Sequence, residues 1–407
     1  MIRLGVSGSG YIEERNLTSL PFAGVQLTRT YDVFNVVNLI QRKLFSSSHA
    51  LSVANCLYYD FGVNRRDLLH LVNSISGSSD PWVVSFSHYL PRWNPRSRYG
   101  LKLLSGDACK KLIAISDFAC RAQLRLAQEY PEYADAIRRK LCILHPAQAP
   151  AINTYEEKSL DPDLISFSFV GRDFFRKGGM EILRVFEQLV KEHAPVKLNI
   201  VSTLEYGDYA SKATAADAAK ARQLIASLGD HVNYVPEMSN SEVMKLFIAS
   251  DVGLLPTYDD IYGYSVLECQ AAGCPVISTD VEALPEINSD SIGWLIAVPK
   301  DSTDLVIRTT EQERSDLSAL IQDRLYATVR SICDNRASIR AKGMRSLDRV
   351  KKECRPRDRA AALENIYREA MGLTRPEEHV ISRYTHSPSF GRRESTGVAA
   401  KHSPRIL

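Results

Sequence analysis

The sequence of 407 residues lacks the marks of several protein classes. Its eight cysteines form no CxxC pair, and no His/Cys/Asp cluster has the spacing of zinc ligands. Scattered cysteines of this kind are typical of reduced thiols in a cytoplasmic protein. No apolar run approaches the roughly 20 residues that a membrane-spanning helix needs. The apolar start is too short for a signal peptide, so we expect it to open a buried strand and the protein to be cytoplasmic.

A large excess of charge of one sign is also absent, because the formal net charge is only +3. The basic residues nevertheless gather in two runs, at 92–125 and 345–359. Most such runs are solvated faces. The alternative is a surface that meets a phosphorylated acceptor or the anionic inner face of a membrane. Nucleic acid is not expected as a partner, since neither run interleaves an aromatic platform. We interpret 92–99 as an acceptor-side or membrane-facing loop.

The second half of the chain alternates short apolar runs with amphipathic ones. This pattern predicts strands at 165–171, 196–202, 232–235, 252–256 and 275–279. It predicts helices over 182–190, over 215–228, over 243–249 behind the capping box Ser239–Glu242, and from Ser265 onward. Continuous apolar strands between helices indicate a parallel sheet that is covered on both faces.

The first half is less regular but of the same α/β kind. Strands are expected at 3–7, 68–73, 82–87, 111–116 and 141–144, and helices at 33–45 and at 118–128 behind Ser116 as N-cap. We therefore predict two tandem Rossmann-like domains, over 1–150 and 151–373, joined near 146–163. The remaining 374–407 is rich in Ser, Pro, Arg and His and is expected to be a disordered tail.

A glycine-rich turn follows the first predicted strand. Gly8 and Gly10 begin a dinucleotide-binding pattern, but Glu13 stands where its third glycine belongs. No strand ending in an acidic residue follows about 20 residues later. We predict a plain tight turn here and no NAD site.

A second loop, VGRDFFRKGG, follows the strand predicted at 165–171 and precedes a helix. Ligands of open α/β sheets bind at this carboxyl edge of the strands. Arg172 offers a guanidinium fork and Lys177 a point charge beside a helix N-terminus, which together suit a diphosphate. The alternative is a loop whose two cations are simply solvated.

A third loop lies in PTYDDIYGYSVLECQAAGCPVISTD. Gly263 permits close approach of the backbone, and the next helix points its N-terminal amides at the same sheet edge. A structural alternative remains open, because Ser265-Val-Leu-Glu268 is itself an S-x-x-E capping box. On that interpretation Glu268 only satisfies a backbone N–H, and Asp260 is an exposed turn residue.

The order of these motifs resembles that of the retaining glycosyltransferases of the GT4 family (glycosyltransferase group 1). VGR-x4-KGG and PT-x-x-D-x-YGYSVLE-x-x-AAG-x-PVIST carry the resemblance, together with the HVNYVPEM segment and ALPEI. Asp260 and Glu268 have the spacing of the family's acid-x7-acid motif, although the first position usually holds Glu. The resemblance is strong over 165–298 and thin before that. It implies GT-B architecture, with two Rossmann-like domains facing across a cleft.

The resemblance also implies roles for the donor side of the site. Arg172 and Lys177 would hold the donor diphosphate, and backbone amides at Gly263, Tyr264 and Ser265 would add to that cradle. Glu268 would accept hydrogen bonds from the ribose hydroxyls. Segment 235–237 would line the nucleobase.

Two further residues would act near the reacting sugar. Asp260 would meet the donor sugar, one methylene shorter than the usual Glu. His88, at the end of the strand 82–87, would face the reacting sugar and the acceptor. A structural histidine at a strand end is the alternative for His88.

We therefore expect a hexosyltransferase-type enzyme that moves sugar from a nucleotide sugar to a glycan or lipid-linked acceptor with retention, in surface polysaccharide assembly. It would need no cofactor and no metal, and the protein would lie in the cytoplasm or at the inner face of the membrane. Two alternatives stay open. One is a nucleotide-sugar epimerase, and the other is a GT-B-like protein that binds but no longer transfers, which Asp260 and the non-standard His145-Pro146 both allow.

Overall fold

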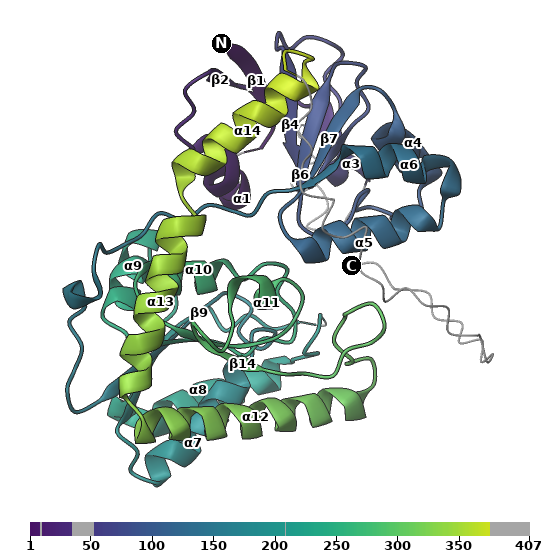
Figure 1. The fold of residues 1–407 in the computed structure, drawn as a ribbon. Coiled ribbons are helices and arrows are strands. Elements are labelled where there is room, and N and C mark those ends of the chain that lie inside the picture. The colour runs from purple at the N-terminus through teal and green to yellow at the C-terminus, as the bar shows by residue number, and fades with distance from the viewer. Residues whose placement is uncertain (9, 35–52, 208, 375–407) are drawn as a thin grey trace, which may run out of the picture. The chain divides into compact units, whose positions relative to one another are not determined.

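The computed structural model describes residues 1–8, 10–34, 53–207 and 209–374. The chain folds into two compact units (Figure 1), one formed by Met1–Ala147 together with the chain from Pro356 onward, and the other by Gln148–Arg355. Among the described residues, no helix is both long enough and apolar enough to cross a bilayer. All eight cysteines are free, and seven of them are buried.

The first unit holds a six-stranded parallel sheet in the order β2-β1-β4-β6-β7-β8. Its strands are β1 (Ile2–Val6), β2 (Val25–Arg29), β4 (Leu68–Val72), β6 (Trp82–Phe86), β7 (Cys109–Ala114) and β8 (Leu141–Ile143). A separate two-stranded sheet pairs β3 (Leu57–Tyr58) with β5 (Ile75–Ser76). The helical elements are α1 (Tyr11–Glu13), the π-helix Glu14–Thr18, α3 (Val53–Cys56), α4 (Arg98–Ser105), α5 (Asp117–Gln128), α6 (Pro131–Lys140) and α14 (Pro356–Ala370).

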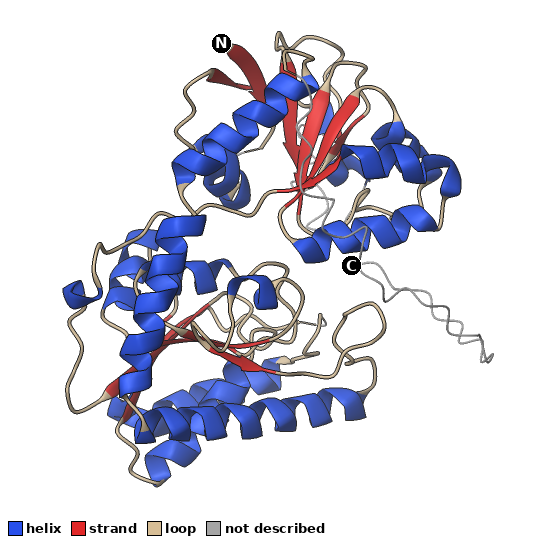
Figure 2. Ribbon diagram, in the orientation of Figure 1, coloured by secondary structure: helices blue, strands red, loops and turns tan. Residues whose placement is uncertain are grey.

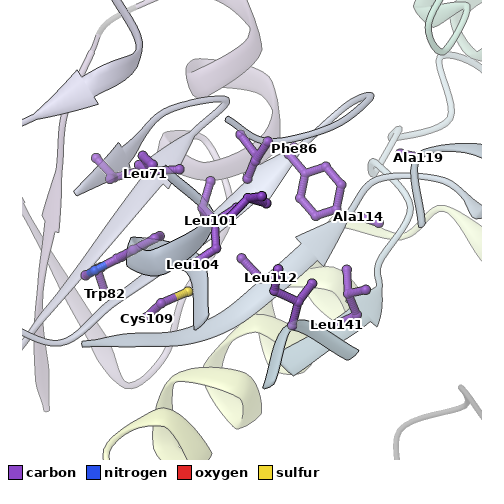
Figure 3. Packing of buried hydrophobic residues seen from close by; sticks show 14 of the residues in the cluster. Leu71, Trp82, Phe86, Leu101, Leu104, Cys109, Leu112, Ala114, Ala119 and Leu141 are labelled. Carbon is purple, nitrogen blue, oxygen red and sulfur yellow. The ribbon is translucent and has the colours of Figure 1, made fainter. Parts of the chain in front are cut away.

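Both faces of this sheet are buried. One face packs Trp82, Phe86 and Leu112 against Leu101 and Leu104 of α4 (Figure 3). The opposite face carries a second apolar cluster, to which α14 contributes Leu363, Ile366 and Tyr367. This two-sided burial explains why the central strands read as continuous apolar runs.

The second unit repeats the plan with the order β11-β10-β9-β12-β13-β14, again all parallel. Its strands are β9 (Ile165–Val170), β10 (Val196–Val201), β11 (Val232–Val235), β12 (Val252–Leu255), β13 (Val276–Thr279) and β14 (Trp294–Ile296). Its α-helices are α7 (Gly179–Lys191), α8 (Ala215–Leu228), α9 (Asn240–Ile248), α10 (Tyr264–Ala271), α11 (Leu284–Ile287), α12 (Glu311–Asp334) and α13 (Ala337–Glu353). Two 3₁₀ turns, Tyr155–Glu157 and Gly229–His231, complete it. Figure 2 shows the helices flanking the strands in each unit.

The structure confirms the α/β class and the parallel sheets. The predicted strands lie within about two residues of the observed ones, and the capping box at Ser239 and the N-cap at Ser116 are both formed. The sequence did not predict β2, α4 or α6. Arg98 and Tyr99, interpreted as part of a loop, open α4. Most of the helix predicted at 33–45 lies outside the described residues.

The last helix belongs to a different unit than the sequence suggested. The predicted second domain ran over 151–373, but α14 groups with the first unit, while α12 and α13 stay with the second. Buried Arg359 donates hydrogen bonds to the Leu144 and His145 carbonyls of the first unit. The tail predicted over 374–407 lies, apart from Thr374, outside the described residues.

Candidate functional site

The strand order of the second unit fixes where a ligand can enter. Chain order runs from β9 outward to β11 on one side and from β12 to β14 on the other, so β9 and β12 are neighbours at the point where the order reverses. Open parallel sheets bind ligands at this switch point, beyond the carboxyl ends of the strands. The two loops that leave these strands, 171–178 and 256–263, are the two that carry the predicted donor-binding residues.

Each loop ends in a glycine that begins a helix. Gly178 caps α7 and Gly263 caps α10, both with φ of +79° in the left-handed region. A Cβ at Gly178 would lie 2.1 Å from the Pro256 carbonyl oxygen, so the loops pack too closely for a side chain there. The first-turn amides of the two helices thus meet at one edge of the sheet, as an anion site requires.

Hydrogen bonds tie the two loops together. The Tyr258 amide donates to the Arg176 carbonyl at 2.9 Å, and the Thr257 hydroxyl donates to the same oxygen at 3.1 Å. The Arg176 guanidinium binds Asp173 in its own loop and the Asp259 carbonyl in the other. The loops therefore form one structure, although 83 residues separate Arg176 from Asp259.

Lys177 and Asp260, both predicted to contact the donor, form an ion pair across this junction at 3.0 Å. Asp260 is buried and also accepts a hydrogen bond of 2.8 Å from the Gly263 amide. Burial alone would raise the pKa of Asp260, but the charges of Lys177 and Arg176 outweigh it, so the pKa lies below its usual value. The alternative that Asp260 is an exposed turn residue is therefore wrong.

Glu268 does not form the capping box that Ser265 suggested. Helix α10 begins at Tyr264 with Gly263 as N-cap and no side-chain cap, so Ser265 is already the second helical residue. The Glu268 carboxylate is buried and accepts a 3.4 Å hydrogen bond from the Asn240 side chain at the start of α9. It is thus held one turn inside α10, on the side that faces α9.

The remaining predicted residues of the donor side lie on the same sheet edge. Arg172 is exposed directly after β9, and 235–237 follows the end of β11. Tyr264 and Ser265 form the partly exposed first turn of α10, and the Tyr264 ring lies 5.3 Å from that of Tyr262.

The sequence did not point to the cluster around Asp259. This buried carboxylate accepts a 2.8 Å hydrogen bond from the Tyr209 hydroxyl and is paired with Arg308 and, at 3.8 Å, with Arg176. Arg308 also donates to the Tyr258 carbonyl. Both carboxylates of the Asp259-Asp260 pair thus have cationic partners, which a divalent metal would have to displace.

His88 lies in the first unit. It follows β6 by two residues, half-buried, with its ring 5.5 Å from Phe118 at the start of α5 and 4.3 Å from Tyr89. It is therefore at the carboxyl edge of its own sheet, as predicted. Gly8, at the end of β1, has φ of +99°, which fits the tight turn expected there.

Two parallel six-stranded sheets, each with helices on its faces, define the GT-B class of glycosyltransferase folds. A solved glycosyltransferase from Rickettsia africae ESF-5 superposes with a TM-score of 0.57, covering 92% of this chain and 99% of that one at 13% identity. HepE from Anabaena, solved in complex with UDP, gives 0.54 over 90% and 99% at 12% identity. At these identities the likeness establishes the fold.

Sequence comparison points to one family over part of the chain. Residues 153–321 match the model of the glycosyl transferases group 1. A D-inositol 3-phosphate glycosyltransferase of Streptomyces avermitilis is 24% identical over 195 residues, which are 46% of this chain and 42% of the relative. The chain thus spans less than half of that relative's length. Its second unit is similar to the glycosyltransferase group 1 (GT4) family over the matched residues.

Proposed function

We propose that the protein is a retaining glycosyltransferase that moves a sugar from a nucleotide-sugar donor to a glycan or glycolipid acceptor. The supporting observation is the junction at the switch point of the second unit. There two glycine-capped helix starts meet beside the Lys177–Asp260 pair. This combination of amides and a held cation suits the phosphorylated end of a nucleotide sugar.

In this proposal the donor is held by charge and by backbone. Lys177 and the exposed Arg172 bind the diphosphate, and the amides at Gly263, Tyr264 and Ser265 complete the cradle. Glu268 accepts hydrogen bonds from the ribose hydroxyls. That HepE was solved with UDP supports a nucleoside diphosphate as the leaving group.

The chemistry follows from where charge develops. As the glycosidic bond to phosphate breaks, the sugar becomes oxocarbenium-like and negative charge grows on the departing diphosphate. Cations and amides already fixed in place stabilise that charge without reorganising. The acceptor attacks the same face of the sugar, and the leaving phosphate takes its proton, so configuration is retained. Asp260 orients the sugar, and His88 faces the reacting sugar and the acceptor.

The acceptor and the location are proposed from the surface charge and the free cysteines. Surface polysaccharide assembly would place the acceptor at the inner face of the membrane, where the exposed Arg98 and Lys102 of the first run and the exposed basic residues of 345–357 suit an anionic lipid surface. Eight free cysteines suit the reducing cytoplasm.

The test measures release of free nucleoside diphosphate from a panel of nucleotide sugars by mass spectrometry, with and without lipid-linked acceptors. Release that depends on an acceptor supports the proposal. An altered sugar without release of diphosphate identifies an epimerase instead. Donor binding without turnover over any acceptor identifies a non-catalytic binding protein.

Variants locate the donor site. Lys177→Ala and Glu268→Gln are expected to weaken donor binding by about 10- to 100-fold, which corresponds to the loss of about 1.5–3 kcal/mol from a charged hydrogen bond. Lys191→Ala is the matched control, because Lys191 is largely exposed at the other end of α7. Lys177→Ala removes the ion-pair partner of the buried Asp260 and can therefore also lower stability. The double variant Lys177→Ala with Asp260→Asn removes both charges, so its melting temperature and its donor affinity separate the two effects. Glu268 is only structural if Glu268→Gln lowers the melting temperature and spares affinity.

A further inference from the structure

Glu282 adopts an uncommon backbone conformation beside this site. It lies between β13 and α11, and its φ of +47° is in the left-handed region. Residues with a Cβ are strained in this conformation, whereas glycine is not. Strain of this kind persists where the surrounding structure fixes it, often at functional sites.

The side chain of Glu282 is as unusual as its backbone. Its Oε2 is sealed from solvent and has no hydrogen-bond partner among the described residues. The charges that act on it most strongly are the carboxylates of Asp259 and Asp260 and the guanidinium groups of Arg308 and Arg176.

Both of those arginines have other partners. Arg308 binds the Asp259 carboxylate and the Tyr258 carbonyl, while Arg176 binds Asp173 and the Asp259 carbonyl. Burial, followed by the negative charges of Asp259 and Asp260, raises the pKa of Glu282 well above its usual value. An uncharged carboxylic acid is a hydrogen-bond donor, which the ionised form is not.

We propose that Glu282 is a donor-binding residue that acts as a neutral carboxylic acid, giving a hydrogen bond to an oxygen at the phosphorylated end of the nucleotide sugar. The inference rests on the proposed function and deepens it. Glu282 lies on the carboxyl edge of β13, which pairs with β12, so it shares the sheet edge with Asp259 and Asp260.

Charge balance explains why a neutral group would be used here. Asp259 and Asp260 already occupy Arg308, Arg176 and Lys177. A third carboxylate would repel both of them and the incoming diphosphate, whereas a carboxylic acid adds a hydrogen bond without adding charge. In this proposal the strained backbone at Glu282 is what directs its carboxylic acid toward the ligand.

The experiment compares three substitutions in the full chain. Binding of UDP, GDP and ADP is measured by calorimetry, and thermal unfolding is followed in parallel. Glu282→Gln keeps an uncharged donor of similar length. Glu282→Gly removes the group and relieves the backbone. Asp304→Gly is the matched control, because Asp304 also has a positive φ, of +65°, but is exposed and does not belong to the cluster.

The proposal predicts that Glu282→Gln binds within threefold of wild type, and that Glu282→Gly binds at least tenfold more weakly while its melting temperature is unchanged or raised. Asp304→Gly is expected to leave affinity unchanged. The inference is overturned if Glu282→Gly binds like wild type, or if Glu282→Gln loses as much affinity as Glu282→Gly. If wild type binds none of the three nucleotides and releases none from the donor panel, the proposed function itself fails.

Discussion

The two units share one architecture but differ in the setting of one conspicuous group of buried polar side chains in each. In the first, His70 lies within β4, with its ring nitrogens hydrogen-bonded to the Tyr367 hydroxyl at 2.6 Å and the Ser85 hydroxyl at 2.8 Å. In the second, the buried charges of Asp259 and Asp260 lie in a loop beyond the strand ends. His70 and its partners join two strands of a sheet to α14, whereas Asp259 and Asp260 lie at the carboxyl edge, where open parallel sheets bind ligands.

The largest effect is expected from breaking a buried ion pair of the first unit. Arg66 and Asp60 are paired, with side chains 1% and 0% exposed. Burial opposes the charge on Asp60, but hydrogen bonds from Arg66 and Asn64 lower its pKa to about 2. Arg66→Met leaves that carboxylate buried and without its cation, which should cost about 3–5 kcal/mol.

Thermal unfolding measures this loss, and Arg3→Met is the control because Arg3 meets Asp67 at the exposed edge. The assignment of a structural role would fail if Arg66→Met lowered nucleotide affinity without lowering the melting temperature.

A slightly smaller effect is expected at the loop junction of the second unit. Gly178→Ala places a methyl group against a backbone oxygen and in a left-handed conformation, so we expect a loss of about 3 kcal/mol together with weakened donor binding. Gly62→Ala shares only the positive φ, of +71°, since nothing lies within 4 Å of its Cβ position, and should cost about 1 kcal/mol. Chemical denaturation measures the free energy of unfolding of both variants. If the two variants lost the same amount, close packing of the loops would not be the reason for glycine at position 178.

The third prediction concerns pH. Burial, reinforced by the charge of Arg359, lowers the pKa of His70 from 6.5 to about 3. Because the unfolded chain takes up a proton below pH 6.5 and the folded chain does not, the stability that His70 contributes should be constant above that pH. Below it, this contribution should fall by at most about 1.4 kcal/mol per pH unit. Glu282, whose pKa is raised, contributes a slope of the opposite sign above its usual pKa, so the His70 contribution is the difference between wild type and His70→Gln.

Urea titrations between pH 7.5 and 4 measure this slope, and His70→Gln should flatten it. A slope that persists in His70→Gln would have to come from other groups. The carboxylates with lowered pKa act mainly below pH 4.

The smallest effect is expected for Tyr367→Phe, which removes one hydrogen bond to His70 and keeps the ring in the core. We expect the free energy of unfolding to fall by about 1 kcal/mol, and only in the first unit. Hydrogen exchange of β4 and β6 should report it, while α10 should exchange unchanged. Faster exchange in α10 would mean that the two units are not independent.

The sequence predicted the central strands well, because strands buried on both faces, such as Trp82–Phe86, are apolar throughout. It missed β2, an edge strand of partly exposed and polar residues, whose pattern differs little from a loop. It also missed α4, in which Lys and Arg alternate with the buried Leu101 and Leu104.

The sequence named the candidate site residues, whose roles stay predictions, but not the contacts between them. The spacing of Asp260 and Glu268 marked both residues, yet no local pattern pairs Lys177 with Asp260, because they come from loops that only tertiary structure joins. S-x-x-E suggested a cap at Ser265, but a glycine two residues earlier begins the helix. Glu282 was missed because a positive φ at a glutamate leaves no trace in the sequence.

The placement of α14 has a consequence for how the protein is made. The first unit is completed by α14, which is synthesised after the whole second unit. Until Tyr367 emerges, His70 lacks one partner and the apolar face over Leu4 and Leu68 stays uncovered. The first unit therefore cannot complete its fold until the second unit has been synthesised. A chain truncated before α14 would expose that apolar face to chaperones and proteases.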